Sequence, residues 1–184
     1  FDWHAWWALE LESKPGRIDY AGWAQELHRY FYARNIAVDF VHPGAALTDY
    51  ALVVAPALYL LTKADADNLT DFVARGGTLL ATYFSGIVDE HEHVVLGGYP
   101  AWLRPVLGLW VEEWAPYAEG QTNGVRFAGA RGAPVKTGHW CDVVHLEGAR
   151  ALATYTHDFF AGRAAVTEHA YGKGHAYYLG TKLE

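Results

Sequence analysis

Two buried strands on either side of one amphipathic helix constrain the fold of this chain more than any other feature. Leu52 to Ala55 is continuously apolar rather than alternating, which is the pattern of a strand covered on both faces in a parallel sheet. A helix is then predicted to open at Thr62, with Asp65 completing a capping-box variant, and to stop at Gly76-Gly77. Thr78 to Phe84 is a second buried strand. Strand, helix and strand with short connections predict a doubly wound α/β sheet.

The residues before this unit predict one more helix and one more strand. Between Ile18 and Arg34, large apolar side chains recur at three- and four-residue intervals, the spacing of an amphipathic helix. Ile36 to Val41 is short and β-branched and is closed by His42-Pro43-Gly44, so we expect a strand that leaves into a turn. Phe1 to Trp3 read like the end of a strand, and we expect them to pair in a sheet. Since the sequence also has no Met, we expect it to be a segment of a longer protein.

The pattern changes after Gly108, where short strand-like runs are separated by glycines. These runs are Leu109 to Trp114, Val125 to Phe127, Val143 to Leu146, Ala151 to Tyr155, Ala164 to His169 and His175 to Leu179. The last two predict a hairpin that turns at Gly172-Lys173-Gly174. No linker or repeat interrupts the chain, so residues 1–184 are expected to form one domain, an α/β half followed by a strand-rich half.

Composition excludes several classes of partner. Fourteen Lys and Arg against 21 Asp and Glu leave a net charge of −7 with His neutral, the wrong sign for a surface that must neutralise phosphates. We therefore expect neither nucleic acid nor an anionic membrane as a partner. The longest apolar run, Tyr50 to Leu61, contains Pro56 and falls well short of the roughly 20 residues that span a bilayer. Cys141 is the only cysteine, which excludes an internal disulfide and favours a reducing, cytoplasmic location.

A search for catalytic or metal-binding motifs finds only weak candidates. Ser85-Gly86 follows a buried strand and would suit a nucleophile, with His139 or His157 as its base, but Phe84 stands where a nucleophile elbow needs a small residue. His91 and His93 alternate in an acidic stretch, yet no third ligand closes a metal site. A turn serine and a solvated loop are therefore the preferred interpretations.

Carboxylate and glycine pairs do not predict a site either. The adjacent Glu112-Glu113 would point to opposite faces of a strand, whereas glycosidase chemistry needs two carboxyls that face each other across a sugar. Gly76-Gly77 and Gly97-Gly98 fit no dinucleotide or phosphate-loop pattern. We therefore predict no catalytic, metal-binding or cofactor-binding residue. The tryptophans at 3, 6 and 7 are the unusual feature, and they suit a core, a sugar-stacking platform or a protein interface.

Several separate stretches, in order along nearly the whole chain, resemble the middle domain of family 42 β-galactosidases. These stretches are Phe1 to Glu10, Val38 to Pro43, Thr82 to Glu90, Leu96 to Pro100 and Tyr171 to Gly180. The resemblance implies a three-layer, flavodoxin-like α/β domain of the class I glutamine amidotransferase-like type, with a mostly parallel sheet and a strand-rich C-terminal half. It also implies a non-catalytic role in homotrimer formation, with no cofactor, next to a catalytic TIM barrel that would precede Phe1.

The same resemblance separates this chain from the usual chemistry of the amidotransferase-like fold. That fold places a nucleophilic Cys in an elbow after a buried strand, and here the elbow has Ser85 while Cys141 lies far downstream. The catalytic glutamates of the β-galactosidases belong to the barrel, so no glutamate of this chain inherits their roles.

Aromatic residues near the N-terminus and after the second buried strand are the candidates for the trimer interface. They are Trp6, Trp7, Tyr83, Phe84, Tyr99 and Trp102. Two alternatives from other classes stay open: a stand-alone Ser/His hydrolase or amidotransferase-like enzyme that uses Ser85, and a carbohydrate-binding module that uses exposed tryptophans.

Overall fold

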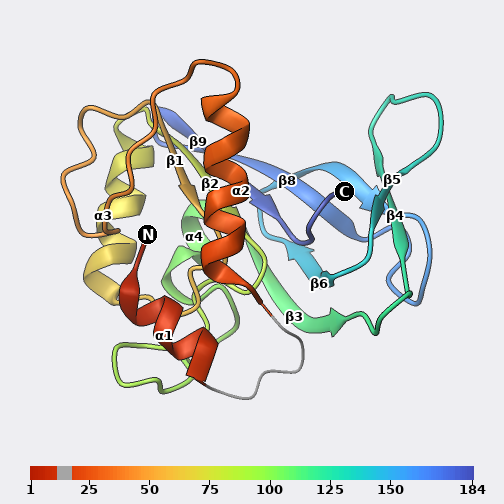
Figure 1. Ribbon diagram of the computed structural model, residues 1–184. Helices are drawn as coiled ribbons and strands as arrows, with labels where there is room; N and C mark the ends of the chain where they lie inside the picture. Colours follow the sequence, from red (N-terminus) through yellow and green to blue (C-terminus); the bar gives the residue numbers. More distant parts are fainter. Residues whose placement is uncertain (12–17) are drawn as a thin grey trace.

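The computed structural model describes residues 1–11 and 18–184 (Figure 1). The helices are α1 (Trp3–Leu11), α2 (Tyr20–Tyr32), α3 (Lys63–Ala74), the 3-10 helix η1 (Ala101–Leu103) and α4 (Arg104–Leu107). The strands are β1 (Leu52–Ala55), β2 (Thr78–Thr82), β3 (Leu109–Pro116), β4 (Asn123–Phe127), β5 (Val135–Thr137), β6 (Trp140–Leu146), β7 (Arg150–Tyr155), β8 (Ala164–Tyr171) and β9 (Gly174–Leu179). In Figure 1 the three long helices gather around β1 and β2, and β4 and β5 project at the opposite end.

The described residues form a seven-stranded sheet in the order β1-β2-β9-β8-β7-β4-β5 and a two-stranded sheet of β3 and β6. Only the β1–β2 and β2–β9 pairs are parallel, and the other neighbours in the large sheet are antiparallel. The expectation of a mostly parallel sheet is therefore wrong, and the fold is a mixed α/β arrangement. The cause is the short connections of the second half, because strands joined by a tight turn can pair only antiparallel. The predicted hairpin of β8 and β9 is confirmed, and it turns at Gly172, which has a φ of 58°.

Helices α2 and α3 form where capping and periodicity predict them. Asp19 precedes α2 and accepts a hydrogen bond from the Gly22 N–H at 2.8 Å. Thr62 precedes α3, where its hydroxyl accepts from the Asp65 N–H at 3.1 Å and donates to the Asp65 carboxylate at 2.8 Å. These bonds satisfy N–H groups that a helix start leaves without a partner.

The prediction that Phe1 to Trp3 pair in a sheet is wrong, because helix α1 begins at Trp3. The Asp2 carboxylate accepts hydrogen bonds from the N–H groups of His4 at 2.7 Å and Ala5 at 3.3 Å. Asp2 is therefore an N-cap residue, and the chain is helical from Trp3 onward. Just ahead of it, the amino group of Phe1 donates to the Val41 carbonyl at 2.6 Å.

The predicted strand from Ile36 to Val41 is also absent from the described ladders. These residues are not assigned to any strand, and β1 is the outermost strand of the sheet. A strand needs a neighbour for its N–H and C=O groups, and this segment has no ladder partner within the described ranges. None of the described helices is long and apolar enough to cross a membrane.

A buried polar cluster fixes the contact between the two sheets. Asp142, on β6, accepts hydrogen bonds from the Trp140 indole N–H at 2.8 Å and from the Tyr178 hydroxyl of β9. Burial raises the pKa of Asp142 to about 7, and the hydrogen bonds from Tyr178 and Trp140 limit the rise. The carboxyl is therefore partly neutral near physiological pH, and it links β6 to β9 of the large sheet.

Replacing this carboxyl tests its role in the fold. Asp142→Asn should lower the free energy of unfolding by about 1–3 kcal/mol near pH 5, because the neutral carboxyl brings one buried O–H donor whereas the amide brings two N–H donors, and the extra donor has no acceptor. The pKa of Asp142 is higher in the folded chain than in the unfolded one, so the unaltered chain loses stability from this group as the pH rises toward about 7, and the Asn variant does not. The stability difference, measured by urea unfolding, should shrink between about pH 5 and about pH 8. A difference that stays constant or widens would contradict this assignment.

Candidate functional site

The structure places Ser85 as a turn residue rather than as an accessible nucleophile. Its side chain is 1% exposed. The hydroxyl donates to the Thr82 carbonyl at 2.8 Å and accepts from the Leu58 N–H at 3.0 Å, so both bonds go to the backbone. His139 packs against Tyr83, where burial lowers its pKa, and His157 follows β7, two strands beyond β9 in the sheet. No hydrogen bond of the Ser85 hydroxyl in the described part of the chain goes to a histidine, so the geometry does not support a Ser/His hydrolase.

The acidic loop that carries His91 and His93 is closed by its own backbone. The Asp89 carboxylate accepts from the N–H groups of His91 and His93, each at 2.9 Å. These bonds lower the pKa of Asp89, with the bond from His93 as the largest favourable cause. Asp89 therefore acts as a turn-closing residue, in agreement with the interpretation as a solvated loop.

A second acid–histidine group, which sequence reasoning missed, joins the starts of α1 and α3. The His42 ring places Nε2 3.5 Å from an Asp2 oxygen and Nδ1 3.9 Å from an Asp65 oxygen. One ligand atom from each of Asp2, His42 and Asp65 lies within 4.8 Å of the other two, a spacing that could hold a metal ion. Nδ1 also accepts from the Gly44 N–H at 3.0 Å. The arrangement is that of a bridge between two helix caps, and no sequence spacing signals it.

Helix α1 exposes its tryptophans and buries its small residues. Ala5, Ala8 and Leu9 are at most 5% exposed, whereas Trp3 is 57% and Trp7 53% exposed. A soluble surface helix ordinarily directs its largest apolar side chains inward. Large exposed apolar patches mark interaction sites.

The exposed tryptophans belong to a continuous group of rings, which we call the α1 aromatic patch. It consists of Phe1, Trp3, Trp6, Trp7 and Phe40. Trp3 lies 5.4 Å from Phe1, 5.3 Å from Trp6 and 6.5 Å from Trp7, measured between ring centroids. Phe40 lies 6.3 Å from Phe1 and is 56% exposed. Trp6 is half-buried at the inner side of the patch.

Tyr83 and Phe84, two of the sequence candidates, lie in the core. Tyr83 stacks on Trp23 at 4.6 Å, and Phe84 lies 4.6 Å from Trp140, in both cases between ring centroids. Burial raises the pKa of Tyr83 strongly. Neither side chain is more than 3% exposed, so both pack the interior and leave little surface for a partner.

The other two candidates, Tyr99 and Trp102, are half-buried beside an exposed apolar loop. Val94 is 51% and Leu96 is 90% exposed in this loop, and sequence reasoning did not select either of them. Arg104 holds the loop by donating to the Gly97 carbonyl at 2.6 Å and pairing with Glu147. We call residues 94–102 the apolar loop. The apolar loop and the α1 aromatic patch are thus two exposed apolar surfaces that contain sequence candidates.

Comparisons with known proteins identify the family. The family model described as "Beta-galactosidase trimerisation domain" matches residues 1–184. A β-galactosidase of Geobacillus sp. (strain Y412MC61) is 47% identical over 182 residues, which are 98% of this chain and 27% of that protein. One from Heyndrickxia coagulans is 45% identical over 99% of this chain and 27% of its own length. The chain thus spans about a quarter of the length of these relatives.

Solved structures give the same result. The cold-adapted β-galactosidase of Rahnella sp. R3 superposes with a TM-score of 0.95 at 39% identity, covering 100% of this chain and 28% of that one. The β-galactosidase of Bacillus circulans sp. alkalophilus also gives a TM-score of 0.95, at 36% identity, with 100% of this chain and 28% of that one covered. The chain therefore belongs to the β-galactosidase trimerisation domain family.

Proposed function

We propose that this chain is the non-catalytic assembly domain of a bacterial β-galactosidase and holds catalytic TIM barrels in a homotrimer. The observation that carries the proposal is the exposure of Trp3 and Trp7 on a helix that buries alanines instead. Exposed tryptophans cost solubility in a lone domain, and they are enriched at the centres of interfaces. The barrel would precede Phe1 in the longer chain and carry out the hydrolysis of terminal β-galactosides. The whole of residues 1–184 would act as one unit without a cofactor.

We further propose the flavodoxin-like, class I amidotransferase-like arrangement for the α/β half. The parallel β1–β2–β9 unit and the tight turn after β2 support it. Phe84, in that turn, has a φ of 58°, the left-handed backbone expected of a sharp elbow. The neighbouring Ser85 hydroxyl makes hydrogen bonds only to the backbone. This agrees with the loss of nucleophilic catalysis at this elbow. The free, buried Cys141 agrees with a cytoplasmic location.

A ring of three identical chains needs a heterologous interface, in which one patch of each chain meets a different patch of the next. The α1 aromatic patch and the apolar loop are two different surfaces of this kind. Arg104 donates to the Gly97 carbonyl in the loop and pairs with Glu147 outside it. These contacts fix the backbone next to Leu96. We propose that the α1 aromatic patch of one chain meets the apolar loop of the next.

Trp7→Ala should weaken assembly of a full-length β-galactosidase that carries this domain by at least about tenfold, since exposed tryptophans at interface centres contribute most of the binding energy. The unfolding temperature of the isolated domain should hardly change, because Trp7 is 53% exposed. Sedimentation equilibrium measures the association. Phe159→Ala is the matched control, since Phe159 is 72% exposed in the strand-rich half. Equal effects of the two substitutions would contradict the proposal.

A mixing experiment tests the pairing of the two patches. Leu96→Glu should also weaken trimer formation, because the side chain is 90% exposed and a charge would be desolvated in the interface. The variants are compared at a concentration at which each variant alone is monomeric. An equimolar mixture of Trp7→Ala and Leu96→Glu chains should form dimers, because one intact α1 patch can still meet one intact loop. A mixture without dimers would contradict the pairing of these two surfaces.

The exposed tryptophans also suit a second candidate function, a carbohydrate-binding module. Stacking of galactose or lactose on Trp3 or Trp7 would change the intrinsic tryptophan fluorescence. Under the assembly proposal, titration of the isolated domain with either sugar should leave the spectrum unchanged. A saturable change that Trp7→Ala removes would favour sugar binding instead.

A further inference from the structure

The acid–histidine group of Asp2, His42 and Asp65 has the composition of a metal site. Asp2 precedes α1, His42 follows the 36–41 segment, and Asp65 lies in the first turn of α3. One ligand atom of each residue lies within 4.8 Å of the other two. Three side chains from separate segments thus converge on one point, and imidazole with carboxylates is a ligand set that divalent metal ions use in proteins.

The Asp2 carboxylate uses only one of its oxygens inside helix α1. Its Oδ1 accepts both hydrogen bonds at the start of the helix, from the N–H groups of His4 and Ala5. Its Oδ2 accepts no hydrogen bond from the described residues and faces the His42 Nε2 at 3.5 Å, while the Asp2 side chain is only 3% exposed. Buried carboxylates are paired or coordinate metal ions, so this oxygen indicates a cationic ligand.

Asp65 has the same arrangement at the start of α3. Its Oδ2 accepts from the Thr62 hydroxyl at 2.8 Å, and its Oδ1 faces the His42 Nδ1 at 3.9 Å. Within residues 1–11 and 18–184, neither Asp2 nor Asp65 forms an ion pair with a Lys or Arg side chain, and the side-chain ion pairs of both go to histidines. Two buried carboxylates that share a half-exposed imidazole leave negative charge that a divalent cation can balance.

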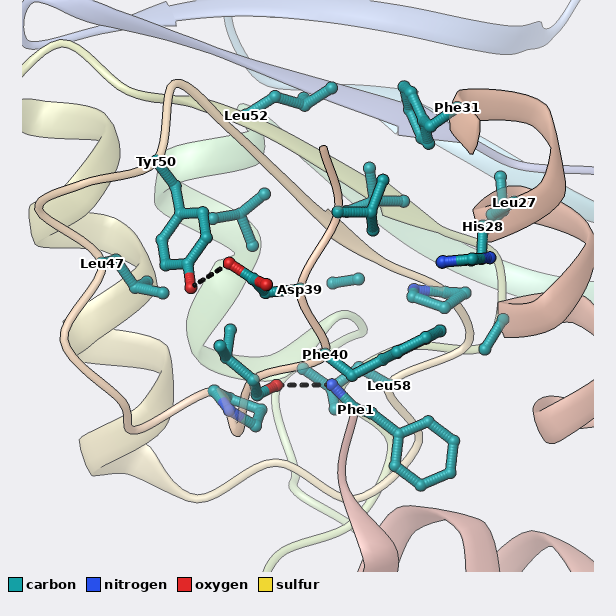
Figure 2. Close-up of a pocket in the computed structure, with 18 of the residues that line it drawn as sticks. Phe1, Leu27, His28, Phe31, Asp39, Phe40, Leu47, Tyr50, Leu52 and Leu58 are labelled. Carbon is teal, nitrogen blue, oxygen red and sulfur yellow. Dashed lines mark hydrogen bonds between the residues drawn. The ribbon is translucent and has the colours of Figure 1, made fainter. Parts of the chain in front are cut away.

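The loop that carries His42 is held in place on both sides of the histidine. After it, the Asn68 side-chain amide of α3 donates to the Pro43 carbonyl at 2.7 Å. Before it, the Tyr50 hydroxyl donates to the Asp39 carboxylate at 3.1 Å, as Figure 2 shows. Supporting hydrogen bonds of this kind keep a ligand in position before the metal ion arrives.

The His42 ring presents Nε2 to a cation. Its Nδ1 accepts from the Gly44 N–H at 3.0 Å, so the proton of the neutral ring is on Nε2 and points to Asp2. The 3.5 Å between Nε2 and the Asp2 Oδ2 is close to the separation of about 3.4 Å between two ligands of a tetrahedral zinc ion, at bond lengths of about 2.1 Å. The His42 side chain is 50% exposed, which gives an ion a path from the solvent.

We propose that Asp2, His42 and Asp65 bind a divalent transition metal ion of the zinc type, which joins the start of α1 to the start of α3. The imidazole nitrogen selects zinc over magnesium and calcium, which prefer oxygen ligands. Binding at Nε2 moves the ring proton to Nδ1, and the Gly44 N–H loses its acceptor. The ion fixes the orientation of the helix that carries the α1 aromatic patch, and this goes beyond the proposed assembly role.

The test titrates Zn²⁺ alone into the chelator-treated chain and follows the heat of binding by calorimetry. The unaltered chain should bind one ion at this site, and Asp65→Asn should weaken that binding at least about tenfold. The Asn amide oxygen can still accept from the Thr62 hydroxyl, so the helix start is preserved. Asp2→Asn is the second variant, because its amide oxygen can still cap α1. Mg²⁺ at the same concentrations should give no binding.

His93→Gln is the matched control for zinc that binds to exposed histidines. His93 lies 4.0 Å from the Asp89 carboxylate in a second, more exposed acid–histidine pair. This substitution should leave the affinity of the tight site unchanged. Absence of Zn²⁺ binding would overturn the proposal. Equal affinities of the unaltered chain and Asp65→Asn, or a loss in His93→Gln as large as in Asp65→Asn, would overturn it as well.

The Gly44 amide reports which ring nitrogen binds the ion. Its native-state hydrogen exchange should be at least about threefold faster with saturating Zn²⁺, relative to the Gly22 amide, which donates to Asp19 at a separate helix cap. An unchanged relative rate would contradict binding at the His42 Nε2. These measurements need only the single domain, so they can fail while the proposed trimer stands, and the reverse also holds.

Discussion

The position of β9 is the constraint on which the rest of the structure depends. This last strand pairs in parallel with β2 on one side and antiparallel with β8 on the other, so it joins the helix-covered half and the strand-rich half into one sheet. The Tyr178 hydroxyl of β9 donates a hydrogen bond to the Asp142 carboxylate of β6. This bond connects the two-stranded sheet to β9. Because the partners of β9 are far apart in the sequence, both halves of the chain must be present before this arrangement can form.

Local signals predicted the elements that local interactions build. Helix α3 follows from the Thr62 and Asp65 capping pair and from its apolar spacing, and the β8–β9 hairpin follows from its glycine turn. The sheet as a whole did not follow, because strand direction depends on which distant segments pair. The prediction of a strand at Phe1 to Trp3 is wrong for a local reason, because the Asp2 carboxylate caps a helix.

The exposure of the candidate side chains could not be predicted from the sequence. Trp7 and Tyr83 are both large aromatic residues near predicted elements, yet one is 53% and the other 1% exposed. Aromatic type and spacing do not decide this, since exposure is set by the neighbours that the fold brings together. Leu96 carried no signal, because a lone leucine between a valine and two glycines is an ordinary loop sequence. Its importance follows only from its 90% exposure on an anchored loop.

The central claim is that this domain associates with copies of itself. The most direct measurement is the solution mass of the unaltered 20.4 kDa chain by light scattering over a wide range of concentrations. If the domain has its own interface, its measured mass should rise with concentration toward the mass of three chains. A mass of one chain at every concentration would contradict the claim that the surfaces of this domain by themselves hold the trimer together.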